Sequence, residues 1–252
     1  MDRLALDDAV QQFAARGWVV VDVLPDSTRA LLALWADEVA ALPESTGVLQ
    51  HREQTGTGPQ LCRSEHFVDV HAGMRALLTS GPMLDAAGAL LGEPAVLYKE
   101  KINHKLPGGA GYSPHQDAPA YPLVSSHVSA MVAIDDADPD NGGLEVVSRC
   151  FDRVLPVDER GCVDRSVAES LAWEPVVVPA GSTLWFHSRT PHRSGPNRSS
   201  RPRRALYPTY NAAREGDRRA QYYAAKADAF TAAAPGDRAR VSLIGDFEGR
   251  PA

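Results

Sequence analysis

The sequence predicts a mostly β fold, a barrel or jelly roll flanked by helices. Helix signals occupy the first part of the chain, whereas short strand-like segments separated by tight turns dominate residues 95–211. This order is typical of a closed antiparallel sheet wrapped by helices. At 252 residues and 44% apolar composition, the chain can bury one large core. We therefore expect a single domain over residues 1–252, with a helical part at about 1–92 and a C-terminal helix and tail at about 212–252.

The first part of the chain predicts helices and one strand. The predicted helices span residues 6–15, 26–41, 74–79 and 82–91, and the strand spans residues 18–21. Apolar residues recur at helical spacing in the first helix, which Gly17 ends, while Asp26 caps the second and Pro43 stops it. Gly92 closes the last. Residues 44–66 are polar and Gly-rich without a clear period, so we expect a loop that could cover the active-site mouth.

Strand signals dominate from residue 95 onward. The predicted strands span residues 95–106, 126–134, 143–148, 174–178, 182–187 and 203–210. An Ala-rich, charged segment at 212–232 predicts a last helix, and the tail from Asp237 has no clear pattern.

Two segments about seventy residues apart carry the candidate metal ligands. The first, Ser113–Asp117, contains His115 and Asp117, and the second, Thr190–Asn197, contains His192. Successive side chains of an extended chain point to opposite faces, so His115 and Asp117 can converge on one ion. Two imidazoles and one carboxylate are the ligand set of a non-haem Fe(II) oxygenase, which leaves the other metal positions open.

A candidate co-substrate anchor follows these ligands. A 2-oxoglutarate molecule that chelates iron through its keto acid end needs a cation for its far carboxylate. Arg203 lies eleven residues after His192, and guanidinium binds carboxylate in a bidentate manner. Ser194 could donate to the same carboxylate, although it could equally be a turn serine. Arg204 is the alternative anchor, and a solvated basic run is the structural alternative for both arginines.

Together with the stretches at Asn103–Gly109 and Asn141–Val147, the candidate metal ligands and Arg203 resemble the phytanoyl-CoA dioxygenase group of Fe(II)/2-oxoglutarate-dependent oxygenases. The resemblance covers about residues 95–211 and runs through Asn103–Gly109, His115–Asp117, Asn141–Val147 and Gly181–Arg203. It implies a double-stranded β-helix, with Fe(II), 2-oxoglutarate and O₂ required for activity. It further implies that 2-oxoglutarate is oxidatively decarboxylated to succinate and CO₂ while an unactivated C–H bond is hydroxylated. The position of Arg203 matches the place of this family's anchoring arginine.

The carboxylate ligand bears on the outcome of the reaction. Related halogenases replace this acid with a small residue, so Asp117 favours hydroxylation over chlorination, while desaturation and ring formation stay open. Two other classes also stay open. A non-catalytic binding or sensing barrel would be expected to have lost a ligand or the arginine. A 2-oxoglutarate-independent, cupin-like metal enzyme is disfavoured by Arg203 and Ser194.

The strand before the metal motif suggests a substrate class. One face of this strand carries Lys99, Lys101, Asn103 and Lys105. The face either meets solvent or lines the barrel mouth. In the second case Asn103 contacts 2-oxoglutarate, and Lys99 or Lys101 meets an anionic group. The substrate would then be a small metabolite with a carboxylate, phosphonate or phosphate, such as an amino acid, a phosphonate or a natural-product intermediate. Tyr112 and Tyr121 flank the metal motif and either line the pocket or pack at the rim.

Composition limits the partners and the location. The net charge of -6 disfavours a nucleic-acid partner. Without an eighteen-residue apolar run or a signal segment, we expect a cytoplasmic enzyme that acts on a small molecule away from membranes. Three cysteines without CxxC spacing predict reduced thiols rather than a metal cluster or a disulfide framework. The sequence does not indicate an oligomeric state.

Overall fold

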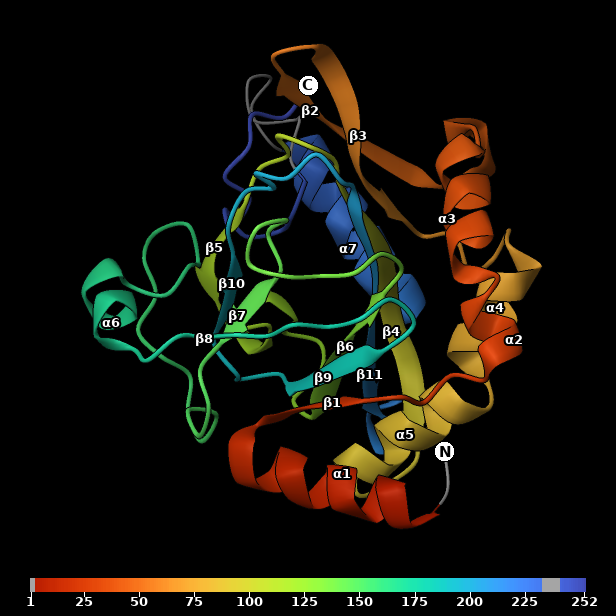
Figure 1. The fold of residues 1–252 in the computed structure, drawn as a ribbon, viewed down its shortest axis with the longest axis vertical. Coiled ribbons are helices and arrows are strands. Elements are labelled where there is room, and N and C mark those ends of the chain that lie inside the picture. Colours follow the sequence, from red (N-terminus) through yellow and green to blue (C-terminus); the bar gives the residue numbers. More distant parts are fainter. Residues whose placement is uncertain (1–2, 233–240) are drawn as a thin grey trace.

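Two antiparallel sheets face each other at the centre of the protein, seen in a computed structural model that describes residues 3–232 and 241–252 (Figure 1). The larger sheet has the order β1-β9-β6-β11-β4-β3-β2, and the smaller has the order β5-β10-β7-β8. The strands of the larger sheet, in that order, are Trp18–Val21, Thr183–His187, His127–Ala133, Arg203–Ala212, Ala95–Lys105, Gly58–Glu65 and Leu49–Thr55. Those of the smaller are Tyr112–His115, His192–Ser194, Leu144–Val146 and Glu174–Pro175.

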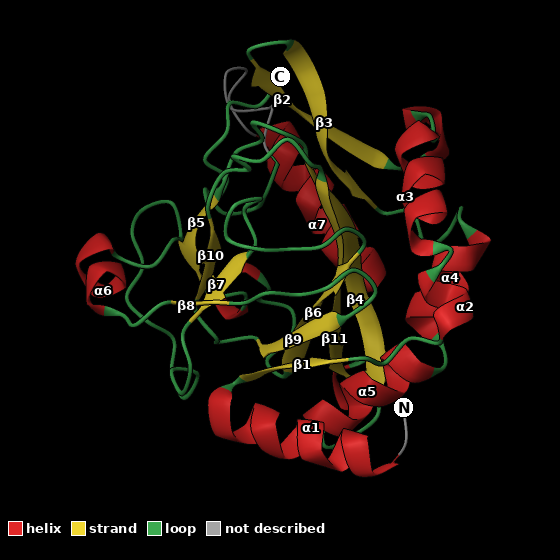
Figure 2. Cartoon of the chain, in the orientation of Figure 1, coloured by secondary structure: helices red, strands yellow, loops and turns green. Residues whose placement is uncertain are grey.

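Helices cover the outer face of the larger sheet, as Figure 2 shows by colour. They are α1 (Arg3–Arg16), α3 (Leu32–Ala41), α4 (Ala72–Thr79) and α5 (Pro82–Leu91), with the short α2 (Asp26–Arg29) before α3. A large apolar cluster fills the space between these helices and the sheet, with Phe13, Leu32, Met74, Ile102 and Trp185 among its buried members. The last helix, α7 (Arg219–Ala232), contacts β4 and reaches the cavity, while α6 (Arg165–Ser170) lies beside the smaller sheet. The predicted mostly β fold with flanking helices is confirmed. None of the described helices is long and apolar enough to cross a bilayer.

A second apolar cluster packs between the two sheets. It includes Met131, Val146, Leu184, Phe186 and Ala205. Trp185 and Phe186 therefore point to opposite sides of β9, as the strand period requires. Beyond this cluster the space between the sheets is polar and holds the candidate site.

One predicted segment is wrong. Residues 44–66 are not a loop, because β2 and β3 form a hairpin that pairs with β4 and extends the larger sheet. The register places Thr55 opposite Gly58 at the turn. The hairpin lies at the edge of the sheet and carries few apolar residues, so it lacks the alternating apolar pattern that identifies a half-buried strand.

Smaller differences concern element ends. The predicted helix at 26–41 is broken into α2 and α3, and the last helix begins at Arg219 rather than 212. The short strands β5 and β10, which carry the metal motif, were not predicted as strands. Residues 237–240 of the predicted tail lie outside the described part of the chain.

Candidate active site

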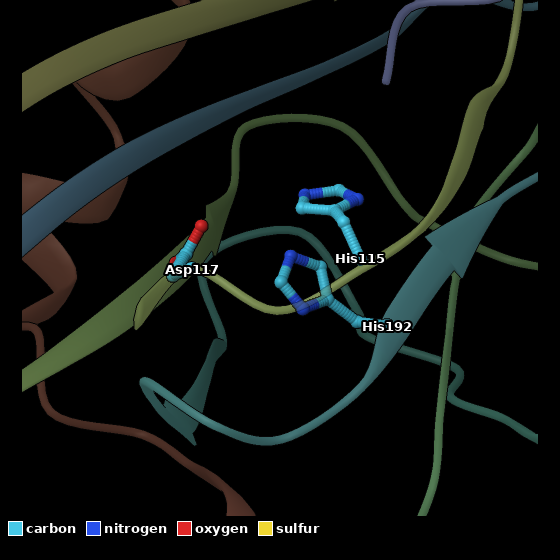
Figure 3. A group of neighbouring side chains, drawn as sticks. All are labelled: His115, Asp117 and His192. Atoms are coloured by element: carbon cyan, nitrogen blue, oxygen red, sulfur yellow. The ribbon is translucent and has the colours of Figure 1, made fainter. Parts of the chain in front are cut away.

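The three candidate metal ligands meet between the sheets (Figure 3). His115 ends β5, Asp117 follows it, and His192 begins β10. The two histidines are direct partners across the β5–β10 pair, and their ring centres are 4.2 Å apart. All three side chains are buried, and one candidate ligand atom from each lies within 4.8 Å of the others. The geometry could hold one metal ion on one face.

Backbone carbonyls orient both imidazoles. Nδ1 of His115 lies 2.7 Å from the carbonyl oxygen of Ser113, and Nδ1 of His192 lies 3.0 Å from that of Thr190. A carbonyl only accepts, so each Nδ1 carries the proton and donates. Each Nε2 is then left with a lone pair for a metal, the usual arrangement at metal-binding histidines.

The protonation states also suit a cation. Burial, helped by the neighbouring His115, lowers the pKa of His192 to about 4, so its ring is neutral at neutral pH. Burial alone would raise the pKa of Asp117, but the two imidazoles and Lys99 outweigh it and hold that pKa below its usual range. Ser129 donates a hydrogen bond to Asp117 and fixes the carboxylate.

Behind one wall of the cavity, formed by Ser194 and Tyr207, lie two cations, Lys105 and Arg203, which are partners across β4 and β11. The fully buried Arg203 donates to the Tyr207 hydroxyl at 3.0 Å and to the Gly142 carbonyl at 2.7 Å. Lys105 donates to the Ser194 hydroxyl at 2.8 Å and to the Gly142 carbonyl at 3.1 Å. We call this group the Arg203 end.

The Arg203 end fits the far carboxylate of 2-oxoglutarate. Within the described chain, the hydrogen-bond partners of Arg203 and Lys105 are all neutral oxygens, and Nε of Arg203 is buried without a partner. Buried cations without an acid are costly, so an anion would stabilise them. The alternative anchor, Arg204, instead binds Asp135 at 2.9 Å and Asp37 at 2.7 Å. The geometry therefore favours Arg203.

The opposite end of the cavity contains the two lysines of the β4 face. Nζ of Lys99 lies 4.5 Å from the ring centre of Tyr121, and Nζ of Lys101 lies 5.4 Å from that of Tyr207. Neither ammonium donates a hydrogen bond to any residue of 3–232 or 241–252. Burial lowers the pKa of Lys99 and, with the help of Arg63, lowers that of Lys101 further. The solvent-facing alternative for this strand face is wrong, because both lysines line the cavity.

A third cation, Arg63 on β3, was missed by sequence reasoning. Its Nε donates to Asn103 at 3.0 Å and its Nη1 to the Val241 carbonyl at 2.7 Å, while Nη2 is buried without a partner. Glu65 pairs with Arg63 at 3.4 Å and with Lys226 of α7 at 2.7 Å. One carboxylate is thus shared by two cations. Arg63, Lys99, Lys101 and Lys226 line the cavity here. We call the first three, which belong to β3 and β4, the Arg63 end.

The other predicted residues also reach the cavity. Ser194 lines it next to Lys105, and Tyr121 lines it next to Lys99. Asn103 and Tyr112 also line it, and both contact Arg63. Asp246, from the C-terminal tail, lies between the ends and was not predicted. Neither residue had a usable signal in the sequence, because Arg63 lies in a polar hairpin without apolar alternation and Asp246 in a tail without a clear pattern.

A double-stranded β-helix that holds two histidines and an aspartate in its mouth is the architecture of non-haem iron oxygenases. Residues 19–205 match the Phytanoyl-CoA dioxygenase (PhyH) family. The chain belongs to this family.

Named relatives agree with this assignment. The chain is 42% identical over 257 residues to a methylphosphonate hydroxylase from Gimesia maris, which covers 100% of this chain and 99% of the relative. It is 37% identical over 202 residues to a 2-aminoethylphosphonate dioxygenase from an uncultured bacterium, covering 78% of this chain and 77% of the relative.

Solved structures show the same fold. The epimerase SnoN, solved in complex with Fe3+, alpha ketoglutarate and nogalamycin RO, matches 100% of this chain and 96% of its own at a TM-score of 0.71 and 22% identity. EctD from S. alaskensis, solved with 2-oxoglutarate and 5-hydroxyectoine, covers 85% of this chain and 79% of its own at a TM-score of 0.69 and 20% identity. The predicted double-stranded β-helix is confirmed. The protein is an Fe(II)- and 2-oxoglutarate-dependent dioxygenase.

Proposed function

We propose that this enzyme hydroxylates the carbon bonded to phosphorus in a small phosphonate. The observation that carries the proposal is the Arg63 end, where two lysine ammonium groups and one guanidinium nitrogen have no hydrogen-bond partner in the described chain. Several cations that converge on one point suit an oxyanion with three oxygens better than a flat carboxylate. Two relatives named for phosphonates support this class over amino acids or other metabolites.

The proposal assigns the metal to the three ligands described above. His115, Asp117 and His192 would hold Fe(II), with each imidazole fixed by its Nδ1 hydrogen bond. Arg203, which donates to the cavity-lining Tyr207, would bind the far carboxylate of 2-oxoglutarate, and Ser194 would donate to it. When bound, the iron and 2-oxoglutarate supply O₂ activation, with succinate and CO₂ as by-products.

The protein's own residues position the substrate. Lys99, Lys101 and Arg63 would hold the phosphonate so that its carbon faces the metal ligands, because His115 and Asp117 line the cavity beside these three cations. Tyr121 packs under Lys99 and forms part of the wall. Tyr112 and Asn103 both contact Arg63 and would line the cavity where substrate and co-substrate meet.

The remaining expectations form part of the proposal. We propose that residues 1–252 act as one catalytic domain, supported by β1 and β3, which pair with barrel strands from far along the chain. We further propose a cytoplasmic location and no nucleic-acid partner. The free thiols of all three cysteines support the location, and the net charge of -6 supports the absence of such a partner.

Turnover with defined phosphonates tests the substrate class. Fe(II)-loaded protein is given 2-oxoglutarate, O₂ and either methylphosphonate, 2-aminoethylphosphonate or acetate. We expect one succinate for each phosphonate consumed, with a new hydroxylated phosphonate visible by phosphorus NMR, and no stimulation by acetate. Succinate release that no phosphonate stimulates would reject the proposal.

A further inference from the structure

The C-terminal segment delivers an acid to the Arg63 end. Residues 241–252 run across the cavity and are held at both sheets, because Ser113 of β5 donates to the Asp246 carbonyl at 2.7 Å and Gln54 of β2 donates to the Arg250 carbonyl at 2.7 Å. Tyr112 also packs against Phe247, with ring centres 5.3 Å apart. The Asp246 side chain is thereby fixed in the cavity wall.

Asp246 is a buried carboxylate that the protein leaves incompletely paired. The residue is 3% exposed, and Oδ1 of its side chain has no hydrogen-bond partner within the described chain. Oδ2 lies 3.6 Å from Nε2 of His115, the nitrogen that would bind the metal. Arg63, Lys99 and Lys101 line the same wall of the cavity. Asp246 therefore places a carboxylate among cations, and a carboxylate can only accept hydrogen bonds.

An acceptor among cations restricts which oxyanion can bind. Lys99, Lys101 and Arg63 attract any oxyanion, whereas the Asp246 carboxylate repels one whose oxygens are all bare. The repulsion becomes a hydrogen bond if the ligand brings a proton on one oxygen. A phosphonate keeps such a P–OH group as a monoanion, but a sulfonate of the same shape is fully ionised at neutral pH.

We propose that Asp246 determines specificity by accepting a hydrogen bond from the P–OH group of a monoanionic phosphonate, which selects phosphonates against sulfonates. The inference rests on the proposed phosphonate function of the same cavity. It gives Oδ1 the partner that the protein lacks. It also explains how a carboxylate can lie beside three cations that bind an anion.

Methylphosphonate and methanesulfonate are matched probes, because they share shape and differ in this proton. Their binding to protein loaded with Fe(II) and 2-oxoglutarate is measured by calorimetry without O₂, for the wild type, Asp246→Asn and Asp246→Ser. The wild type should prefer methylphosphonate. A charge-assisted hydrogen bond contributes enough that the preference should fall by about tenfold to hundredfold in Asp246→Asn. Sulfonate binding should tighten, because the amide can donate to a bare oxygen.

Glu248→Gln is the matched control. Glu248 belongs to the same segment and accepts from Ser113 at 3.1 Å, but it does not line the cavity. Its replacement should leave the preference unchanged. The visible charge-transfer band of the iron–2-oxoglutarate complex, recorded for each variant, reports whether the metal site is intact.

Each alternative gives its own result. If both Asp246 variants keep the wild-type preference for methylphosphonate over methanesulfonate, the inference is overturned. The proposed phosphonate function is then still supported, provided that the wild type binds methylphosphonate. Loss of the charge-transfer band in both variants would show that Asp246 serves the metal instead. A wild type that binds neither probe would reject the phosphonate function itself.

Discussion

The two ends of the cavity hold their cations in different ways. At the Arg203 end, Arg203 and Lys105 are fixed by carbonyl and hydroxyl oxygens at 2.6–3.1 Å. At the Arg63 end, Lys99 and Lys101 rest on aromatic rings and donate no hydrogen bond within the described chain. The first arrangement holds its donors in fixed positions, which suits a ligand that is the same in every turnover, as 2-oxoglutarate would be. The second leaves the lysines able to adapt to a substrate.

The acids differ as well. Two acids lie at the Arg63 end. Glu65 forms ion pairs with Arg63 and Lys226, and Asp246 lines the cavity. The Arg203 end has no acid bonded to its cations among the described residues. A carboxylate of a dianionic co-substrate thus suits the Arg203 end. The Arg63 end, where acids lie among the cations, suits an anion that can also donate a hydrogen bond. Two of the candidate metal ligands, His115 and Asp117, line the cavity toward both ends.

Loss of a metal ligand should therefore disable both ends together and have the largest effect. Asp117→Ala removes the only carboxylate of the ligand group. We expect turnover below detection and no iron–2-oxoglutarate charge-transfer band, both measured after metal removal and reloading. Full activity in a reloaded Asp117→Ala or His115→Ala sample would contradict the ligand assignment.

Arg203→Ala should break only the co-substrate end. Removal of one partner of a buried charged pair costs about 2–5 kcal/mol, so the KM for 2-oxoglutarate should rise by about thirtyfold or more. Iron affinity should change little. Arg204→Ala is the control, because Arg204 binds Asp135 and Asp37 outside the cavity. A larger effect from Arg204→Ala would place the anchor one residue later.

Lys101→Met should weaken only the substrate end. We expect the KM for methylphosphonate to rise by about tenfold to hundredfold, because one charge-assisted hydrogen bond is lost. The methionine keeps the length of the side chain. Slow 2-oxoglutarate decay without substrate should continue at the wild-type rate. Unchanged kinetics with the phosphonate would remove Lys101 from the substrate site.

The outer face of β4 should affect stability rather than ligand binding. His104 lies there beside Ser64 at 3.0 Å, and burial, with Arg204, lowers its pKa to about 4. The unfolded chain takes up this proton near pH 6.5, so the folded state loses stability as pH falls from about 6.5 to 4. In His104→Gln this loss should shrink by on the order of 2–3 kcal/mol. The free energy of unfolding of the metal-free wild type and variant is measured with urea at pH 7 and pH 5. An equal loss of this free energy in both proteins would contradict the lowered pKa of His104.

Much of the site follows from short-range sequence patterns. His115 and Asp117 are positioned by one extended segment, and the two-residue period of β4 places Lys99 and Lys101 on one face. Arg63 and Asp246 could not be predicted in this way. The position of Arg63 depends on the pairing of β3 with β4, and that of Asp246 depends on tail contacts with both sheets. Such long-range register is set by tertiary packing, which a polar segment without periodicity does not reveal.

An anaerobic titration tests the two-ended account most directly. Fe(II) and then 2-oxoglutarate are added to metal-free wild type, Arg203→Ala and Lys101→Met, followed by methylphosphonate, while the visible charge-transfer band is recorded. We predict that 2-oxoglutarate produces the band at low concentration in the wild type and Lys101→Met but not in Arg203→Ala. Methylphosphonate should then perturb it at a low concentration in the wild type and only at a much higher one in Lys101→Met. Equal titrations for all three proteins, or no band in the wild type with iron bound, would contradict the account.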